Sequence, residues 1–173
     1  MEFQKAAAGD FLRVRQFYWD LIDAMADQND TIGWKKGVYP ADDFLRESLE
    51  RGELYLLTED GALAASVILN SACNPGYDGA SWTVDCAPEE VLIPHALAVD
   101  PSLQGRGLGR RLVRELFALA RSQGKKGVRL DILGTNAGAE RLYTGMGFRF
   151  VQARTLFYED TGWTEYRLFE YPL

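Results

Sequence analysis

The segment QGRGLG, residues 104–109, places three glycines within six residues, between an apolar run and an amphipathic one. Glycine has the most backbone freedom to lose on folding, so this cluster indicates that another group approaches the backbone closely. A loop that enters a helix presents unpaired N–H groups at the positive end of the helix dipole, where phosphate groups bind readily. The spacing therefore predicts an anion site.

The charge distribution agrees with this prediction. Residues 104–129 contain eight basic residues and one acidic residue, Glu115, although the whole chain has a formal net charge of -6. An acidic chain argues against general nucleic-acid binding, and no nucleic-acid partner is expected. The basic segment fits either a local anion site or a solvated helix face. Two common nucleotide loops are absent: Arg110 stands where the dinucleotide fingerprint needs its third glycine, and no Gly-Lys-Ser/Thr follows.

The elements that would position this loop follow from hydrophobic periodicity and turn residues. Strands are predicted at 2–7, at 53–69 as a hairpin turning at Asp60-Gly61, at 82–84, at 91–99, at 127–133, and as a pair in 148–173 around the turn 159–163. Helices are predicted after an N-cap at Asp10, from about Pro40 to Gly52, from Leu108 to Gly124, and within 136–148. Residues 28–40 and 70–81 read as loops. The order is β-α-α-β-β-β-α-β-α-β-β, which predicts an α/β (α+β) fold with a mixed sheet and packed helices in one domain, residues 1–173.

Composition restricts the class of protein further. Hydrophobic residues make up 47% of the 173 residues, and no apolar run approaches the roughly 18 residues that cross a bilayer. No secretory signal is visible, so a cytoplasmic protein without a membrane partner is expected. Cys73 and Cys86 show no metal spacing, and the single histidine, His95, leaves no obvious zinc site, so no metal is expected.

Two motifs together resemble one family. The pattern Q-x-x-G-x-G after a strand ending in LAVDP is similar to the acetyl-CoA pyrophosphate loop of the GNAT acyltransferase superfamily. The pattern N-x-x-A-x-x-L-Y, formed by Asn136, Ala139, Leu142 and Tyr143 and followed by Gly145, Gly147 and Phe148, resembles the second half of the same cofactor site. The resemblance is close over about residues 53–150.

The resemblance implies a GNAT fold, with a mixed central sheet splayed between two strands and flanking helices, and acetyl-CoA as the cosubstrate. The two strands would be HALAV (95–99) and RLDIL (129–133), with the pantetheine arm between them. The cofactor-binding residues that it implies are Leu97, Val99, Gln104, Gly105, Arg106, Gly107, Gly109, Arg110, Asn136 and Tyr143.

Acyl transfer to an amine needs a base for the amine proton, donors for the carbonyl oxygen and an acid for the departing thiolate. The resemblance makes Tyr143 the acid and a backbone N–H near Leu97 or Val99 the carbonyl donor. For the base, His95 is a candidate because its ordinary pKa suits neutral pH and strand alternation places it on the same face as Leu97 and Val99. The rival carboxylates are Asp131 and the pair Glu89-Glu90.

The acceptor is expected between the loops 28–40 and 74–84, where aromatic faces suit an apolar or cationic group. Trp34, Tyr39 and Trp82 are the predicted substrate-binding residues, with Tyr77 as a further aromatic wall. The expected partner is a small-molecule primary amine. The alternatives are a peptide or protein amine, or a CoA-binding sensor without catalysis. The aromatic tail, Tyr158, Trp163, Tyr166 and Tyr171, would either close the site or form the edge of a possible homodimer.

Overall fold

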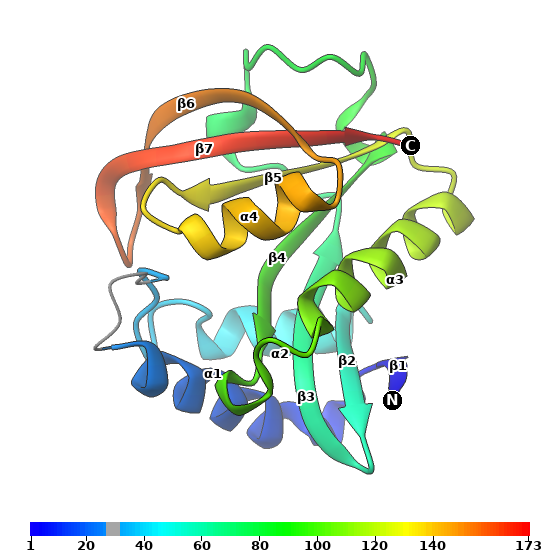
Figure 1. The fold of residues 1–173 in the computed structure, drawn as a ribbon, viewed down its shortest axis with the longest axis vertical. Coiled ribbons are helices and arrows are strands. Elements are labelled where there is room, and N and C mark those ends of the chain that lie inside the picture. The colour runs from blue at the N-terminus through cyan, green and yellow to red at the C-terminus, as the bar shows by residue number, and fades with distance from the viewer. Residues whose placement is uncertain (27–31) are drawn as a thin grey trace.

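A seven-stranded sheet in the order β1-β2-β3-β4-β5-β7-β6 forms the middle layer of the molecule (Figure 1). The computed structural model describes residues 1–26 and 32–173. Only β4 and β5 pair in parallel; the other neighbouring strands are antiparallel. The strands are β1 (Glu2–Lys5), β2 (Leu54–Glu59), β3 (Ala62–Asn70), β4 (Val91–Val99), β5 (Gly127–Leu133), β6 (Arg149–Tyr158) and β7 (Gly162–Pro172).

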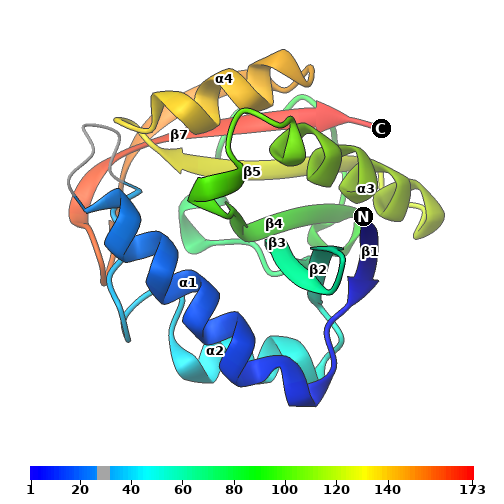
Figure 2. The same ribbon diagram turned by 60° about the horizontal axis from the view of Figure 1, so that its bottom comes forward.

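Helices cover both faces of the sheet (Figure 2). One face carries α1 (Phe11–Met25) and α2 (Asp42–Glu50), and the other carries α3 (Leu108–Ser122) and α4 (Ala137–Gly145). The described residues also form four short 3₁₀ turns: η1 (Ala8–Asp10), η2 (Pro75–Tyr77), η3 (Pro88–Glu90) and η4 (Pro101–Leu103). The predicted fold class and the predicted order of the long elements are therefore confirmed.

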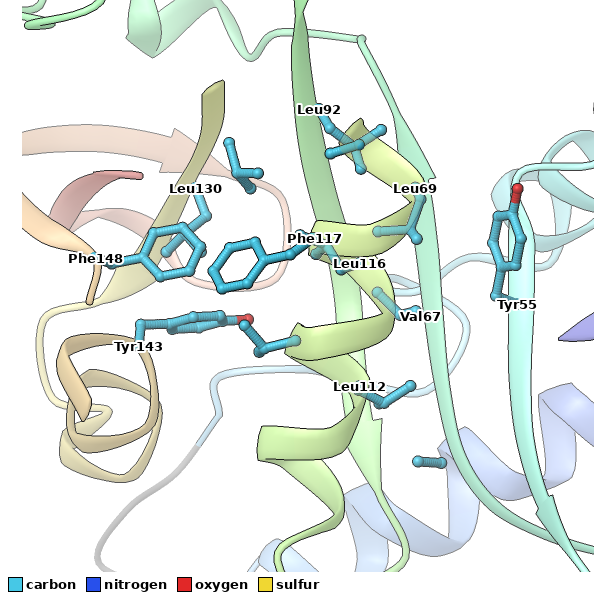
Figure 3. Packing of buried hydrophobic residues seen from close by; sticks show 14 of the residues in the cluster. Tyr55, Val67, Leu69, Leu92, Leu112, Leu116, Phe117, Leu130, Tyr143 and Phe148 are labelled. Atoms are coloured by element: carbon cyan, nitrogen blue, oxygen red, sulfur yellow. The ribbon is translucent and has the colours of Figure 1, made fainter. Parts of the chain in front are cut away.

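A hydrophobic core lies on each face, as the helical spacing requires. On α3, the apolar residues that recur at helical spacing are all buried: Leu108, Leu112, Val113, Leu116, Phe117 and Ala120. They pack on β3, β4 and β5, and on Tyr143 and Phe148 near the end of α4 (Figure 3). On the opposite face, α1 and α2 bury a second cluster that includes Tyr18, Leu45 and Ile68. The two cores fix the middle of the sheet from both sides.

The sheet opens where its only parallel pair should continue. Strands β4 and β5 pair at Val91 with Gly127 and at Leu92 with Val128, and nowhere further along. Pro94 follows at once, and because it has no N–H it cannot donate to a ladder. Beyond it, residues 95–99 keep β3 as a partner, while β5 keeps β7. The predicted splay between 95–99 and 129–133 is thus present.

Three local predictions need correction. Residues 82–84 do not form a strand, because the N–H groups of Thr83 and Val84 donate to the Glu170 carboxylate instead of to a strand. The second helix begins at Asp42 rather than near Pro40. Asp10 precedes α1, but its carboxylate accepts from the N–H of Ala7, at the start of η1, and does not cap α1. The predicted loop 28–40 lies partly outside the described residues, at 28–31.

Candidate active site

A cavity of about 290 Å³ occupies the region where β4 and β5 part. Residues from both sides of the sheet contribute to its wall, because the gap between the strands joins the α1/α2 side to the α4 side. The polar and titratable residues of the wall are Tyr39, Asn74, Tyr77, His95, Asp131, Asn136, Tyr143, Tyr158, Asp160 and Tyr166, and the apolar ones include Ile32, Trp34, Phe44, Leu97 and Ala139. Acid–base groups and an apolar surface therefore share one cavity.

A β-bulge in β4 changes which side chains face the cavity from each side. His95 pairs with Ile68 and Ala98 pairs with Ser66, so β4 holds one extra residue between these pairs. Ala96 takes up the difference with a φ of 49°, in the left-handed region. Ala96 packs in the α1/α2 core, and the His95 ring meets Phe44 of α2. Leu97 and Val99 pack against the α3 core instead.

The prediction that His95 shares a strand face with Leu97 and Val99 is therefore wrong, because simple alternation does not hold across a bulge. His95 nevertheless remains in the cavity wall. His95 thus lines the cavity, but its ring lies on the α1/α2 side of the sheet and not on the side of Leu97 and Val99.

The tautomer of His95 follows from its hydrogen bonds. Asn70 donates from Nδ2 to Glu53, at 3.0 Å, so its Oδ1 is the atom that faces His95 Nε2, at 2.9 Å. Because an amide oxygen can only accept, Nε2 must carry the proton, and Nδ1 is left as the acceptor nitrogen. Burial lowers the pKa of His95 from 6.5 to about 4. The ring is therefore neutral at neutral pH and only a weak base.

Asp131 stands on β5 as the carboxylate of the cavity. Its Oδ1 accepts a hydrogen bond from the Tyr77 hydroxyl at 3.0 Å, and its Oδ2 accepts one from Tyr158. The Asn74 amide in turn donates to the Tyr158 oxygen. Burial raises the pKa of Asp131, and the two tyrosine hydrogen bonds oppose that rise only in part. Asp131 is therefore a stronger base than an exposed aspartate and is held in one orientation.

Tyr143 reaches the cavity from α4. Its ring packs edge-on against Phe148, with ring centroids 5.2 Å apart, and extends towards α3 (Figure 3). Within the described part of the chain, no group forms a hydrogen bond with its hydroxyl. Burial raises the pKa of Tyr143 above its ordinary value of 10, so the hydroxyl keeps its proton. It can therefore act as a proton donor.

Asn136, which begins the same helix, has a second task that its predicted role did not include. Its Oδ1 caps α4 by accepting from the N–H of Ala139 at 3.0 Å. The residue also lines the cavity, and its Nδ2 group has no acceptor among the residues that the structure describes. The amide can therefore fix the helix with one atom and bind with the other.

The glycine loop presents a row of free main-chain donors. No described group accepts a hydrogen bond from the backbone N–H of residues 105–110, which lead into the first turn of α3. Gly105 and Gly107 have φ values of 78° and 77°, and a Cβ at either would project into open space. Gly109 differs, because a Cβ there would come within 3.1 Å of Leu142 on α4. Two glycines thus shape the loop, and the third lets two helices pack closely.

The side chains around this loop lie on the surface. Gln104 and Arg110 are exposed, and the Arg106 guanidinium forms two hydrogen bonds with the Glu59 carboxylate, at 2.9 and 3.0 Å. The Nη2 atom of Arg110 lies close to Gly145, at the end of α4. An exposed ion pair is worth little, about 0–1 kcal/mol, so Arg106 can be recruited by a stronger anion. The residues present therefore suit a ligand rich in phosphate groups.

The predicted aromatic walls are only partly brought together. Trp34, Tyr39 and Tyr77 line the cavity, whereas Trp82 does not. Trp82 donates from Nε1 to the Tyr77 carbonyl at 3.0 Å, and its ring lies 4.6 Å from the Arg129 guanidinium. Trp82 therefore stabilises the loop 71–90 from outside the cavity. The structure gives no reason to keep it among the substrate-binding residues.

The rival carboxylates Glu89 and Glu90 precede β4 and are not part of the cavity wall. Glu90 pairs with Lys126 at 2.8 Å and caps η3. The aromatic tail divides: Tyr158 and Tyr166 line the cavity, Tyr171 stacks on Phe117, and Trp163 is 74% exposed.

Four cavity or supporting residues had not been anticipated individually: Phe44, Asn70, Asn74 and Asp160. Phe44 had the spacing of an ordinary core residue. Asp160 sits in the turn 159–163 as a buried polar residue, and burial raises its pKa. The two asparagines gave no signal, because their role depends on partners far away in the sequence.

In residues 1–26 and 32–173, the structure has no helix long and apolar enough to cross a bilayer. The same ranges contain no cluster of three or more histidine, cysteine or acidic side chains that could hold a metal ion.

Comparison with curated proteins gives relatives of the same kind. The chain is 39% identical over 93 residues to N-alpha-acetyltransferase RimI of Mycobacterium tuberculosis, covering 54% of this chain and 56% of that protein. It is 38% identical over 89 residues to the mycothiol acetyltransferase of Beutenbergia cavernae, covering 51% of this chain and 25% of that protein. It is 31% identical over 114 residues to the [ribosomal protein bS18]-alanine N-acetyltransferase of Escherichia coli K12, covering 64% and 66%. The match thus spans about half or less of the first two relatives.

Solved structures share the fold at lower identity. An acetyltransferase of the GNAT family from Streptococcus agalactiae has a TM-score of 0.82 at 16% identity, over 99% of this chain and 95% of that one. The yncA protein of Salmonella typhimurium, determined with its cofactor acetyl-CoA, has a TM-score of 0.71 at 19% identity, over 100% and 94%. Residues 15–148 match the profile of the acetyltransferase (GNAT) family. The chain therefore belongs to the acetyltransferase (GNAT) family.

Proposed function

We propose that this protein is an acetyl-CoA-dependent N-acetyltransferase whose acceptor is a primary amine, the α-amine of a peptide or protein N-terminus. The observation that carries the proposal is the placement of Asp131 and Tyr143 in one cavity, at the gap between β4 and β5. One residue is a buried carboxylate that can take a proton, and the other is a buried hydroxyl that can give one.

The cofactor would lie along the loop 104–109 and in the gap beyond it. The free N–H groups of residues 105–110 would bind the pyrophosphate, with Gln104, Arg106 and Arg110 as neighbours. The open edge of β4 at Leu97 and Val99 would serve the pantetheine arm, together with the Nδ2 group of Asn136. Acetyl-CoA supplies an acyl group that is already activated as a thioester.

The acceptor amine would enter beside Trp34 and Tyr39. Asp131 attracts its ammonium form and takes the proton that must leave before attack. His95, neutral and with Nδ1 as an acceptor, can hold the amine or a water molecule in line, but its pKa of about 4 makes it the weaker base at neutral pH. The Leu97 N–H would donate to the acyl carbonyl oxygen as charge develops there, and Tyr143 would protonate the departing thiolate.

The choice of an α-amine rests on chemistry and on the relatives. A free α-amine has a pKa of about 8, whereas a lysine amine has one of about 10.4, so a carboxylate of only moderate basicity serves the α-amine better. One relative is named an N-alpha-acetyltransferase, and another is named an alanine N-acetyltransferase of a ribosomal protein. A small-molecule amine is the second candidate, and it is supported by the modest cavity and by the mycothiol acetyltransferase relative.

The test is the release of CoA thiol from acetyl-CoA by the purified protein across a matched panel of acceptors. Short peptides with a free N-terminus would be compared with the same peptides blocked at the N-terminus but carrying a lysine, and with polyamines and arylalkylamines. We expect turnover with the free N-terminal peptides alone, and acetylation at the α-amine by mass spectrometry.

Turnover with small amines and not with peptides would favour the second candidate. Binding of acetyl-CoA without turnover on any amine would contradict catalysis and leave a CoA sensor. Tyr143→Phe serves as the control, because it should slow turnover by about 10²-fold or more while leaving acetyl-CoA binding intact.

A further inference from the structure

Tyr18 is a buried residue of α1 that the proposed reaction does not use, yet its hydroxyl reaches the backbone of the site. The side chain is 1% exposed, and the hydroxyl lies 2.8 Å from the carbonyl oxygen of Ala96 and 3.1 Å from Ser66 Oγ. A carbonyl can only accept, so Tyr18 donates its single proton to Ala96, and the Ser66 hydroxyl can donate to Tyr18 in turn. Burial raises the pKa of Tyr18, which keeps that proton in place.

The carbonyl that Tyr18 holds belongs to the most unusual residue of the sheet. Ala96 has a φ of 49°, and apart from Asp60 it is the only residue other than glycine in the described ranges with a positive φ. Alanine pays a steric penalty in this region, so surrounding contacts must hold it there. The Tyr18 hydroxyl is such a contact, and it lies on the α1 side, within the second core.

The hydrogen bond from Tyr18 to the Ala96 carbonyl also fixes the direction of the N–H of the next residue, Leu97. In a planar trans peptide, the C=O of Ala96 and the N–H of Leu97 point in opposite directions. Because the C=O is directed at Tyr18, the N–H of Leu97 is directed away from α1. Leu97 lines the cavity and packs with the α3 core, on the side from which Tyr143 enters.

From this geometry we infer that Tyr18 is a positioning residue, which aims the Leu97 N–H at the acyl carbonyl oxygen by holding the Ala96 peptide in its left-handed conformation. The inference rests on the proposed function, because it needs an acyl carbonyl in the gap between β4 and β5. It assigns to α1 a part in the reaction in addition to its part in the core.

Tyr18→Phe tests the inference, because it removes the hydroxyl and keeps the ring that packs on Phe17 and Trp34. The decisive readout is the ratio of the dissociation constants for CoA and acetyl-CoA, by calorimetry. Only acetyl-CoA has the acyl carbonyl oxygen that the Leu97 N–H would bind. The wild-type protein should therefore bind acetyl-CoA about 2- to 10-fold more tightly than CoA, which is the value of one hydrogen bond. In Tyr18→Phe the ratio should fall to about 1, and kcat should fall at least about 10-fold, with the acceptor KM nearly unchanged.

Two further variants separate positioning from a loss of structure. Tyr55→Phe removes the hydroxyl of another buried tyrosine, on β2 and outside the cavity, and should change neither the ratio nor kcat. Tyr18→Phe/Ala96→Gly should regain part of the preference for acetyl-CoA, because glycine adopts a positive φ without the steric penalty. An unchanged ratio and kcat in Tyr18→Phe would overturn the inference, as would a double variant no better than the single one.

A measurement on the wild-type protein keeps the test independent of how well the variants fold. The amide resonance of Leu97 should shift when acetyl-CoA binds and much less when CoA binds; equal shifts would overturn the inference. If neither compound binds, the proposed function itself fails. If both bind and no amine is acetylated, catalysis fails, while the ratio still decides the role of Tyr18.

Discussion

The two sides of the cavity are built by different means. The proposed cofactor side consists mainly of two short stretches: the loop 104–110 with its free main-chain N–H groups, and the start of α4, where Asn136 offers its side-chain amide. The proposed acceptor side draws on side chains from six separate segments: residues 32–39, α2, the loop 74–77, β4, β5 and the β6–β7 hairpin. A main-chain site needs only a local spacing of glycines and a helix start, whereas a side-chain site needs the whole fold to bring its members together.

The two sides also differ in how they handle charge. The proposed cofactor side offers exposed arginines and free N–H groups, so it would receive an anion without any buried charge of its own. The acceptor side keeps Asp131, Asp160 and His95 in the cavity wall, and burial shifts the pKa of each in the direction that favours its neutral form. Variants on the acceptor side should therefore change proton transfer and pH dependence, and variants on the cofactor side should change affinity.

The largest effect is expected from Asp131→Asn. The amide is similar in size but cannot take a proton, so kcat should fall by about 10²- to 10⁴-fold. The dissociation constant for acetyl-CoA should stay within about threefold of the wild-type value, because Asp131 lies on the acceptor side of the cavity. Steady-state kinetics and calorimetry measure the two quantities. Asp85→Asn, on an exposed loop residue, is the matched control. A full rate in Asp131→Asn would remove Asp131 as the base and return the role to His95.

His95 gives the next largest effect, and it concerns stability. The unfolded chain binds the His95 proton with a pKa near 6.5, and the folded protein binds it with one of about 4. The unfolded state therefore holds more protons in this window, and the free energy of unfolding falls as the pH drops from 6.5 towards 4. His95→Gln should abolish about 2–3 kcal/mol of that fall.

Denaturant unfolding at pH 7.5 and pH 4.5, for the wild type and for His95→Gln, measures this difference. Asp131 and Asp160 work in the opposite direction, because their raised pKa values stabilise the folded state at low pH, and both remain in the variant. Equal pH dependence in the two proteins would mean that the imidazole is not buried in its neutral form. A pH–rate profile from the same variant shows whether His95 also takes part in catalysis.

The local geometry of the loop 104–110 and of the start of α4 could be predicted from the sequence, and the reason is physical. Gly105 and Gly107 are needed for positive φ values, and Asn136 is needed to cap α4; both demands are local and leave their mark on adjacent residues. The order of the long elements was also predictable, since each buries one face with the period of its own geometry. The gap between β4 and β5 was implied by the family resemblance, and the structure ends the pairing of these strands just before Pro94, which cannot donate to a ladder.

The acceptor side could be predicted only in part. The bulge at Ala96 has no sequence signal, because alanine is an unusual residue at a positive φ, and it reverses the face on which His95 lies. Trp82 and Trp34 look alike as loop tryptophans, but Arg129, a buried partner of Glu170, holds one of them away from the cavity. Such outcomes depend on partners from distant segments, which no short pattern records.

A smaller effect is expected from Gly107→Ala. Its φ of 77° imposes strain of about 1–2 kcal/mol on alanine, and the new Cβ would meet no atom of the protein. In the proposed complex we expect this Cβ to crowd the phosphate groups bound at the loop. The dissociation constant for acetyl-CoA should rise by about 10-fold. Gly124→Ala, at a φ of 66° and with equally open surroundings beyond α3, imposes the same strain and should leave the affinity unchanged. Equal losses of affinity would show that strain, rather than contact with the cofactor, is responsible.

The smallest effect should come from the two tryptophans, and it tests where the acceptor side ends. Trp34→Phe shortens a wall of the cavity, so the acceptor KM should rise by a few fold with the acetyl-CoA affinity unchanged. Trp82→Phe removes the hydrogen bond to the Tyr77 carbonyl and weakens the contact with Arg129, so it should lower the free energy of unfolding by about 1–2 kcal/mol and leave the acceptor KM unaltered. If Trp82→Phe raised the KM as much as Trp34→Phe, the acceptor side would extend from residues 74–77 to Trp82, and Trp82 would regain the role that its aromatic ring first suggested.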